Sequence, residues 1–321
     1  MSQAPEITAL CPVYNEENYI ENVLQFFVES KPANKELYII DGGSKDRTVT
    51  IIEKWAKQYP EIHLLHNPHK YVPQALNMGL KSARGKFVVR LDAHTIYASN
   101  YFEKIVETFA TTGADIVGGP MHPVGKTPVQ MAVAHATSGW FGIGNSKFHD
   151  VNYSGFVDSV YLGAWKKELF SEVGYFDDQM VRNQDDEFHY RAKSKGKTIY
   201  LNSEIKSTYF PRSTYKSLFS QYFQYGLYKP LVVKKIKSEV KLRHLIPLFF
   251  VLYLFCSVAA VKFPIILIPM ALYMLIDIYN SFVNYQTVAV KFALILVYPM
   301  LHLSYGLGFL AGLFKSPDKK N

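Results

Sequence analysis

The charged residues of this chain are distributed so unevenly that they divide it into two parts. From Leu245 to Phe314, seventy residues carry only three charges, on Lys262, Asp277 and Lys291. The first 244 residues, by contrast, have the composition of an ordinary charged, soluble protein. Because about 20 consecutive apolar residues are enough to cross a bilayer, the C-terminal stretch predicts membrane helices. A buried helical core is the alternative interpretation.

Three apolar runs follow one another in this stretch. The first is Leu245–Val261, the second follows the single charge of Lys262, and these two predict a tight hairpin. The third, Phe292–Phe314, is an uninterrupted apolar run of 23 residues and predicts a span. Three such runs in succession favour the membrane over a soluble core. The sequence therefore predicts two or three spans within residues 245–314, followed by a tail at 315–321.

A basic and aromatic segment, residues 215–244, precedes the first run and suits a membrane interface. Its basic residues outnumber its one nearby acid, Glu239, and the positive-inside rule places them in the cytoplasm. They are Lys229, Lys234, Lys235, Lys237, Lys241 and Arg243. Three spans would place the basic tail outside, against the same rule. Anionic lipid is a sufficient partner for these cations, so the net charge of +8 does not require nucleic acid.

The N-terminus and the two cysteines indicate a reducing compartment. The first residues, "MSQAPEITALCPVYNEE", lack the basic stretch and apolar run of a signal peptide, so we expect the soluble part to stay in the cytosol. Cys11 and Cys256 match no metal spacing, and we expect neither a disulfide nor a nucleophilic thiol. The whole protein is thus expected in the cell membrane, with its soluble part on the cytoplasmic side.

Short apolar runs alternate with stretches of helical periodicity in the first hundred residues. Strands are expected at Ile7–Val13, Leu37–Ile40, His63–Leu65 and Phe87–Leu91, and helices at Asn18–Ser30, Thr48–Gln58 and Pro73–Ala83. This alternation predicts an α/β fold with a mostly parallel sheet that helices cover on both faces. Ligands of such sheets bind beyond the carboxyl ends of the strands, so the residues that follow each strand are candidates for a site.

Polar loops follow three of these strands and are expected to meet at one crevice: "PVYNEE", "DGGSKDRT" and "DAH". In the second loop, Asp41 precedes two glycines that let backbone approach a ligand, and its carboxylate can accept a hydrogen bond from a base N–H. A turn followed by a helix cap is sufficient to explain Ser44 and Asp46. The dinucleotide-binding pattern G-x-G-x-x-G is absent from the first turn.

Asp92 and His94 flank Ala93 in the third loop, so their side chains are expected to point to the same side and to share a cation. A carboxylate with an imidazole suits Mn²⁺, and Mg²⁺ less well. A hydrogen-bonding pair within the loop is the alternative. The position directly after the fourth strand favours the metal.

A third acidic region, "VRNQDDEFHYRAKSKG" at residues 181–196, places three acids in succession. Acids favour the first turn of a helix, where they face the positive end of its dipole. Glu187 and Arg191 have the spacing of an exposed i,i+4 ion pair. Taken alone, this region is explained by helix structure, and a catalytic role needs support from other motifs.

Such support comes from the order of five motifs, "PVYNEE", "DGGSKDRT", "LNMGLKSARG", "RLDAH" and "NQDDEFHYR". With this set the chain resembles the inverting glycosyltransferases of family 2, which have a Rossmann-like GT-A fold, over about residues 5–215. The motifs "RLDAHTIY", "RNQDDEF" and "YFPRS", with Gly118–Gly119, are most similar to those of bacterial succinoglycan-biosynthesis enzymes, which are membrane-bound and make exopolysaccharide. The resemblance implies a catalytic domain at residues 1–214.

The resemblance also implies roles for individual residues on the donor side. Asp41 would contact the nucleobase, and the nucleotide pocket would be lined by Pro12, Tyr14, Asn15 and Glu16. Asp92 would belong to the metal-binding D-x-D element, in which His94 replaces the second aspartate. A divalent cation, Mn²⁺ or Mg²⁺, is the cofactor that this element implies.

On the acceptor side, the family pattern E-D-x-D/E-L-x-x-R aligns with residues 184–191. Counting back six residues from Arg191 makes Asp185 the catalytic base, with Gln184 in place of the first acid and Asp186 as the reserve candidate. A positioned carboxylate is needed because the acceptor hydroxyl must lose a proton as its oxygen attacks the anomeric carbon.

The resemblance implies transfer of a sugar, expected from a UDP-sugar, to a lipid-linked (polyprenyl diphosphate) saccharide beside membrane lipids. Processive synthases of the family carry Q-x-x-R-W, and the sequence at Gln221 lacks its Arg-Trp, which favours transfer of a single sugar. Two alternatives stay open: a processive polysaccharide synthase, and a catalytically silent membrane scaffold that retains nucleotide binding.

Overall fold

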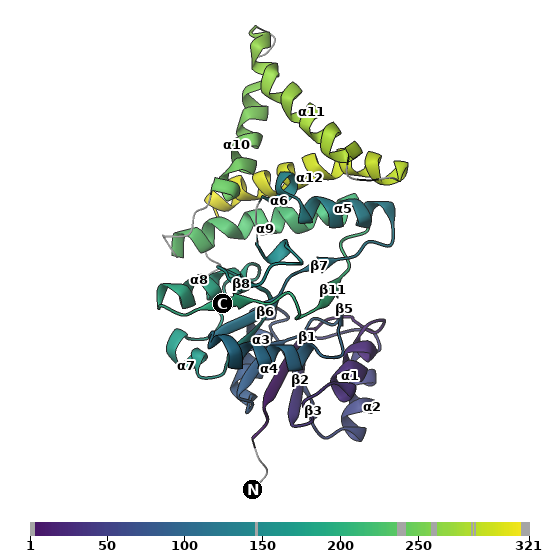
Figure 1. Ribbon diagram of the computed structural model, residues 1–321, viewed down its shortest axis with the longest axis vertical. Coiled ribbons are helices and arrows are strands. Elements are labelled where there is room, and N and C mark those ends of the chain that lie inside the picture. Colours follow the sequence, from purple (N-terminus) through teal and green to yellow (C-terminus); the bar gives the residue numbers. More distant parts are fainter. Residues whose placement is uncertain are drawn as a thin grey trace. The chain divides into compact units, whose positions relative to one another are not determined.

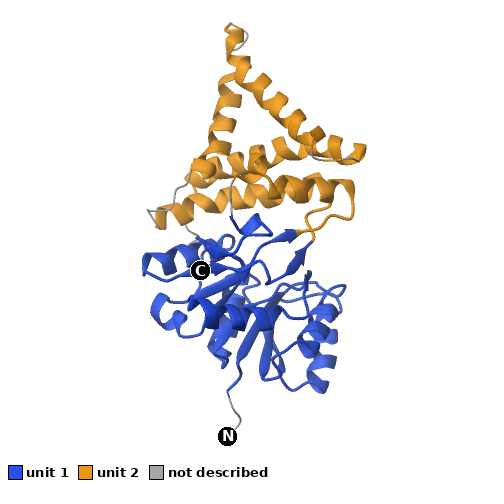
Figure 2. Cartoon of the chain, viewed as in Figure 1, with its two compact units in different colours: residues 1–122, 147–209 blue, residues 123–146, 210–321 orange. Residues whose placement is uncertain are grey.

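The computed structural model describes residues 4–144, 147–235, 242–257, 262–283, 285 and 287–315 (Figure 1). The chain forms two compact units (Figure 2). Unit 1 contains residues 1–122 and 147–209, and unit 2 contains residues 123–146 and 210–321. Unit 2 therefore combines the C-terminal part of the chain with a segment that lies between two parts of unit 1.

The first half of unit 1 is the predicted α/β alternation. Its strands are β1 (Ile7–Val13), β2 (Lys35–Asp41), β3 (Ile62–His66) and β4 (Phe87–Arg90), and its helices are α1 (Ile20–Glu29), α2 (Thr48–Gln58) and α3 (Val72–Ser82). Each element lies within two residues of its predicted bounds. The four strands are parallel in the order β3-β2-β1-β4, so their carboxyl ends lie at one edge.

The second half of unit 1 widens the same sheet to eight strands in the order β3-β2-β1-β4-β9-β6-β10-β8. The added strands are β6 (Ile116–Gly119), β8 (Gly155–Phe156), β9 (Tyr161–Lys166) and β10 (Ile199–Leu201). Strand β9 is antiparallel to both of its neighbours, β4 and β6. The helices of this half are α4 (Tyr101–Thr112), α7 (Leu169–Val173) and α8 (Gln184–Ser194), with a 3₁₀ turn at Lys147–His149.

A small second sheet has the order β5-β11-β7, formed by β5 (Thr95–Tyr97), β11 (Ser207–Tyr209) and β7 (His122–Pro123). Close packing beside it requires a glycine at the end of β6. A Cβ atom on Gly119 would lie 1.8 Å from the carbonyl oxygen of Ile205, so no other residue fits without moving the backbone.

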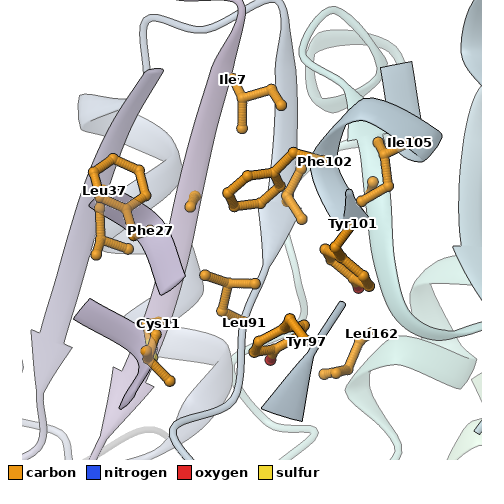
Figure 3. Packing of buried hydrophobic residues seen from close by; sticks show 14 of the residues in the cluster. Ile7, Cys11, Phe27, Leu37, Leu91, Tyr97, Tyr101, Phe102, Ile105 and Leu162 are labelled. Atoms are coloured by element: carbon orange, nitrogen blue, oxygen red, sulfur yellow. The ribbon is translucent and has the colours of Figure 1, made fainter. Parts of the chain in front are cut away.

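Two hydrophobic clusters cover the two faces of the large sheet, as expected for strands that are buried on both sides. Ile7, Cys11 and Leu37 point into the cluster shown in Figure 3, whereas Leu10 and Ile40 point into the other. Burial raises the pKa of the Cys11 thiol well above its ordinary value, which agrees with an unreactive core cysteine.

Unit 2 is helical in its described residues. Its elements are α5 (Pro128–Ser138), α6 (Trp140–Ile143), α9 (Tyr215–Lys235), α10 (Leu242–Cys256), a 3₁₀ turn (Pro264–Leu267), α11 (Ile268–Val283) and α12 (Val288–Leu313). Two helical stretches are long and apolar enough to cross a membrane, Pro264–Val283 and Val288–Leu313, and α10 is apolar but shorter. Several residues of the basic segment and of the tail lie outside the described residues: Lys237, Glu239, Lys241, Lys319 and Lys320.

Candidate active site

The loops that follow β1 and β2 are joined by hydrogen bonds. The backbone N–H of Asn15 donates to Ser44 Oγ at 2.9 Å, and the Asn15 side-chain oxygen accepts from the N–H of Lys45 at 2.8 Å. The N–H of Glu16 donates to Thr48 Oγ1 at 2.8 Å. Asn15 has a left-handed φ of 56°, which asparagine tolerates better than most residues. The two predicted motifs therefore form one connected edge.

Asp41 closes its own loop. Its side chain is almost wholly buried, and the backbone N–H groups of Gly43 and Ser44 donate to its two oxygens at 2.9 and 3.1 Å. His66 Nδ1 lies 3.9 Å from the same carboxylate. The sequence analysis explained Ser44 and Asp46 by a turn and a helix cap. Asp41 also has a structural role in this turn. Contact with a nucleobase stays a prediction for this residue.

Tyr14 is an exposed aromatic residue in the loop after β1, and Pro12 lies in β1 itself, paired with Ile40 of β2. The Nζ atom of Lys70 lies 3.9 Å from the centre of the Tyr14 ring, and a hydrogen bond from Lys70 lowers the pKa of the Tyr14 hydroxyl. Lys70 follows β3, so a third strand-end loop also contributes to this edge. The sequence analysis did not identify Lys70.

Arg90 at the end of β4 interacts electrostatically with two acids of the predicted site, Asp92 and Asp185. Its Nε is 3.1 Å from Asp92 Oδ1, and both side chains are largely buried. Burial acts to lower the pKa of the guanidinium, but the carboxylates of Asp92 and then Asp185 outweigh it, so the pKa is raised. The sequence analysis did not identify Arg90, whose charge interacts with both Asp92 and Asp185.

His94 pairs with Glu16. Its Nδ1 lies 3.2 Å from Glu16 Oε1, while Asp92 has Arg90 as its ion-pair partner. Within the described part of the chain, no group of three or more His, Cys, Asp or Glu residues is arranged to hold a metal. The carboxylate and imidazole donors still fit Mn²⁺ in kind, but substrate phosphates would have to complete the ligand set. A cation on Asp92 and His94 therefore stays a prediction.

The first turn of α8 brings Asp185 and Asp186 together. The residue before the helix, Asn183, has a left-handed φ of 58°, and the N–H of Asp186 donates to Asp185 Oδ1 at 3.0 Å. Burial, and then the charge of Asp186, raise the pKa of Asp185, while Arg90 acts in the opposite direction. A carboxylate with a raised pKa is a better proton acceptor than an ordinary surface aspartate.

Asp186 has different neighbours. Ser159 Oγ donates to Asp186 Oδ1 at 3.4 Å and lies 3.0 Å from His189 Nδ1. Burial lowers the pKa of His189 to about 4, against the opposing effect of Asp186, so the imidazole is neutral at pH 7. Asp186 and His189 are three residues apart on a helix, and this spacing was the sequence signal that their side chains lie near each other.

Glu187 and Arg191 form the predicted i,i+4 pair, but the expectation of an exposed pair was wrong. Arg191 Nε donates to Glu187 Oε1 at 2.8 Å and a terminal nitrogen donates to Oε2 at 2.9 Å. The Glu187 side chain is only 4% exposed. Arg191 also donates to the carbonyl oxygens of Val173 and Tyr175, so this pair anchors α8 to the end of α7 and to the residues that follow it.

A cavity of about 940 Å³ lies elsewhere in unit 1. Its lining includes Pro5 and Glu6, which precede β1, Lys86, which precedes β4, and Glu168 at the start of α7. These are the amino ends of the strands, and none of the predicted site residues lines it. The candidate site is therefore located by the carboxyl ends of the parallel strands and not by this cavity.

Comparison with known proteins identifies the family to which this chain is similar. The model of the family described as "Glycosyl transferase family 2" matches residues 8–174. "Succinoglycan biosynthesis protein ExoA" of Rhizobium meliloti (strain 1021) is 32% identical over 240 residues, which are 74% of this chain and 73% of the relative. A Methanococcus voltae protein, "Dolichyl N-acetyl-alpha-D-glucosaminyl phosphate 3-beta-D-2,3-diacetamido-2,3-dideoxy-beta-D-glucuronosyltransferase", is 26% identical over 319 residues, or 96% and 97% of the two chains.

Solved structures with the same fold extend the comparison. The mannosyltransferase PcManGT from Pyrobaculum calidifontis, in complex with GDP-Man and Mn²⁺, has a TM-score of 0.62 at 16% identity, covering 99% of this chain and 89% of that one. S. aureus TarS 1–349 with UDP-GlcNAc has a TM-score of 0.52 at 14% identity, covering 95% and 90%. The predicted GT-A fold is confirmed.

Proposed function

The chain belongs to glycosyl transferase family 2, and we propose that it transfers a single sugar from a UDP-sugar to a lipid-linked saccharide, with inversion at the anomeric carbon. It is a glycosyltransferase by family, and the choice of donor, acceptor and stereochemistry is our proposal. The observation that supports it most directly is Arg90. One guanidinium interacts with Asp92 on the donor side and with Asp185 on the acceptor side.

The donor nucleotide would bind along the connected loops after β1, β2 and β3. Tyr14 offers a partly exposed aromatic ring there, and Lys70, whose Nζ lies over that ring, offers a positive charge for a phosphate. Asn15 and Asp41 hold the shape of the two loops through backbone contacts, and Glu16 fixes the position of His94. Residues that hold a loop in its binding shape lower the entropic cost of binding.

Asp92 and His94 would hold a divalent cation, Mn²⁺ or Mg²⁺. When bound, such a cation neutralises charge on the diphosphate as it departs. Relatives by fold have been solved with Mn²⁺, as in PcManGT and in GalNAc-T7 with UDP and GalNAc. Arg90 contributes a fixed positive charge next to Asp92, which lets several carboxylates lie close together at this edge.

Asp185 would act as the general base. It accepts the proton of the acceptor hydroxyl while that oxygen bonds to the anomeric carbon and the bond from this carbon to the diphosphate breaks. Attack from the face opposite the leaving group inverts the anomeric configuration. The raised pKa of Asp185 supports this assignment over Asp186, whose carboxylate faces Ser159 on the His189 side.

A lipid-linked acceptor is proposed because of the helices in unit 2 and the names of the relatives. One relative is named for succinoglycan biosynthesis and another for transfer to a dolichyl phosphate sugar. The two long apolar helical stretches would keep the enzyme at the membrane in which such acceptors reside. We place the catalytic unit on the cytoplasmic side, because the basic residues at the end of α9 precede α10.

The first test is a panel of nucleotide-sugars with and without Mn²⁺, read as the melting temperature of the full chain in detergent. UDP-sugars with Mn²⁺ should raise the Tm, because a ligand that binds only the folded state stabilises it. Stabilisation by guanosine or thymidine donors but not by uridine donors would contradict the base assignment.

Product analysis tests the reaction itself. With the stabilising donor and a polyprenyl diphosphate-linked saccharide, the expected product carries one added sugar. A ladder of longer products would identify a processive synthase instead. Donor binding without any turnover across a range of acceptors would support the silent scaffold.

A further inference from the structure

The two long apolar stretches of unit 2 have different surroundings, although either could cross a membrane by composition. In the most apolar part of Pro264–Val283, only 17% of residues are buried within the protein, whereas in α12 the share is 56%. A helix that faces lipid keeps its apolar side chains exposed in the isolated chain, and a helix that packs on protein does not. The two helices therefore have different partners.

Helix α12 packs against α5 and α9 along its first half. Val290, Leu294 and Val297 of α12 are fully buried in one cluster with Ala132 of α5 and Leu218 of α9. This cluster is the hydrophobic core of unit 2. Because α12 contributes to this core, it is a structural element of unit 2 whether or not it contacts a membrane.

In its second half, α12 lies against α9 at backbone distance. A Cβ atom on Gly308 would lie 2.1 Å from the carbonyl oxygen of Phe223, and one on Gly312 would lie 2.3 Å from that of Leu227. A glycine of α9 also permits this close approach, since a Cβ atom on Gly226 would lie 2.1 Å from the carbonyl oxygen of Tyr305 in α12. Such close approach holds the two helices side by side over several turns.

The end of α12 lies beside the end of α9. Lys234 Nζ donates to the carbonyl oxygen of Leu313 at 3.0 Å, and Lys315 Nζ donates to the hydroxyl of Tyr228 at 3.1 Å. Helix α9 carries several lysines and is not a span by composition, so it stays on the side from which α10 starts. Because α12 runs beside α9 to its last residue, α12 stays on that side too.

The hairpin of α10 and α11 contacts α12 through Pro247 and Tyr273 but leaves much of its own surface exposed. Apolar side chains are exposed along both helices, including Ile246 and Phe249 of α10 and Leu272, Leu275 and Tyr279 of α11. The polar residues near the end of α11 are buried instead of facing outward: Asp277, Asn280 and Ser281.

The two legs of the hairpin are connected. The hydroxyl of Tyr253 in α10 donates to the carbonyl oxygen of Ile266 at 2.7 Å and accepts from the N–H of Met270 at 3.2 Å. The stretch Pro264–Val283 has 20 residues, and a helix of that length spans about 30 Å, the thickness of a bilayer core. Lys262 lies just before this stretch, in the connection between α10 and α11. Its charged end would reach the lipid headgroups on the opposite side of the membrane from the start of α10.

We propose that only the hairpin of α10 and α11 crosses the bilayer, and that α9 and α12 lie as a glycine-packed pair at the membrane surface on the side of the catalytic unit. The lipid interior is thus the partner of the exposed hairpin faces. The inference rests on the proposed membrane function. It gives two crossings and returns the tail to the starting side, which removes the conflict with the positive-inside rule that three spans would create.

Cysteine labelling in sealed membrane vesicles of known orientation tests this topology on the full chain. Cys256 is exposed and is replaced by serine, whereas buried Cys11 stays. Single cysteines are then placed at Lys262 between the hairpin legs, at Lys315 after α12, and at exposed Lys57 on α2 of unit 1. Phe263→Cys and Phe314→Cys, both at exposed positions, repeat the first two sites in case a lysine variant misfolds.

A membrane-impermeant maleimide should label Lys315→Cys and Lys57→Cys from one side, and Lys262→Cys from the other, each at least tenfold faster than from the opposite side. Labelling of Lys315→Cys together with Lys262→Cys would make α12 a span and overturn the proposal. Labelling of all three sites from one side would show that the hairpin does not cross, which also overturns it. Release of the protein by alkaline carbonate would instead refute the membrane anchoring in the proposed function.

Discussion

Two acidic regions of unit 1 both interact electrostatically with Arg90, and their own negative charges are compensated differently. At the edge formed by the loops after β1, β2 and β4, each acid has a close partner: Asp41 has backbone N–H groups, Glu16 has His94, and Asp92 has Arg90. In the first turn of α8, two carboxylates lie next to each other in a half-buried position, and the pKa of Asp185 is raised. The first region suits binding of charged groups, and the second suits acceptance of a proton.

The comparison is tested most severely by exchanging the acids of α8. Asp185→Asn keeps the size of the side chain but cannot accept a proton, so transfer should fall by about 10²-fold or more while donor binding stays nearly normal. Asp186→Asn is the matched control and should lose far less. Transfer assays with donor titration measure both. An inactive Asp186→Asn with an active Asp185→Asn would move the base by one residue.

The donor edge is tested through the metal. Asp92→Ala should remove the Mn²⁺-dependent part of donor binding and weaken it by roughly tenfold or more, the scale of effects seen when a metal's supporting ligands are lost. His94→Asp should retain metal-dependent binding, because it restores a second carboxylate. Isothermal titration of donor with and without chelator distinguishes the two variants. Activity of Asp92→Ala equal to that of the unmodified chain would remove the metal from the mechanism.

The contrast between the regions also predicts a pH dependence. Asp185 must be deprotonated to act as the base, and its pKa is raised. As the pH is lowered, the transfer rate should therefore begin to fall at a pH above about 4, where ordinary carboxyl groups titrate. Asp186→Asn removes the neighbouring negative charge that raises the pKa of Asp185, so the acidic limb should move to lower pH. A limb that moves upward in this variant would mean that Asp186 does not raise the pKa of Asp185.

The smallest effect on catalysis is expected for the third acid of α8. Glu187→Gln leaves Arg191 with a buried neutral partner, which should lower the free energy of unfolding by about 1–3 kcal/mol with little change in transfer rate. Glu172→Gln is the control, because its pair with Lys197 is half-exposed and should contribute less than about 1 kcal/mol. Chemical denaturation of both variants measures the difference. Equal losses would show that burial of the Glu187 pair does not matter.

Much of the fold of unit 1 follows from local sequence patterns. The elements from Ile7 to Arg90 were predictable because strand and helix periodicities alternate there with polar loops. Strand β9 was not predictable in the same way. Its six residues, Tyr161–Lys166, pair with β4 and β6, which lie far away in the chain, and tertiary contacts rather than local pattern select this antiparallel position.

Some residues of the candidate site could likewise be predicted from the sequence, and others could not. Its strand-end residues could be located from topology alone, because the carboxyl ends of parallel strands share an edge. Arg90 could not, since nothing in the sequence distinguishes it from an ordinary strand residue, and its interactions with Asp92 and Asp185 depend on the fold. Ser159 and His189 are thirty residues apart and meet only in the folded chain. Hydropathy likewise could not show that α12 faces protein, because it measures composition and not neighbours.

The composition of unit 2 has a consequence for the order of events during synthesis. Helix α5 is made early, between two parts of unit 1, whereas its partners in the core of unit 2 are made later, α9 first and α12 last of the described helices. Apolar residues of α5 such as Val133 therefore leave the ribosome more than 150 residues before Val290 of α12 exists to cover them. Unit 1 can gather its strands before that point, but unit 2 closes only near the end of translation. A chaperone or the membrane surface would have to shield α5 in the interval.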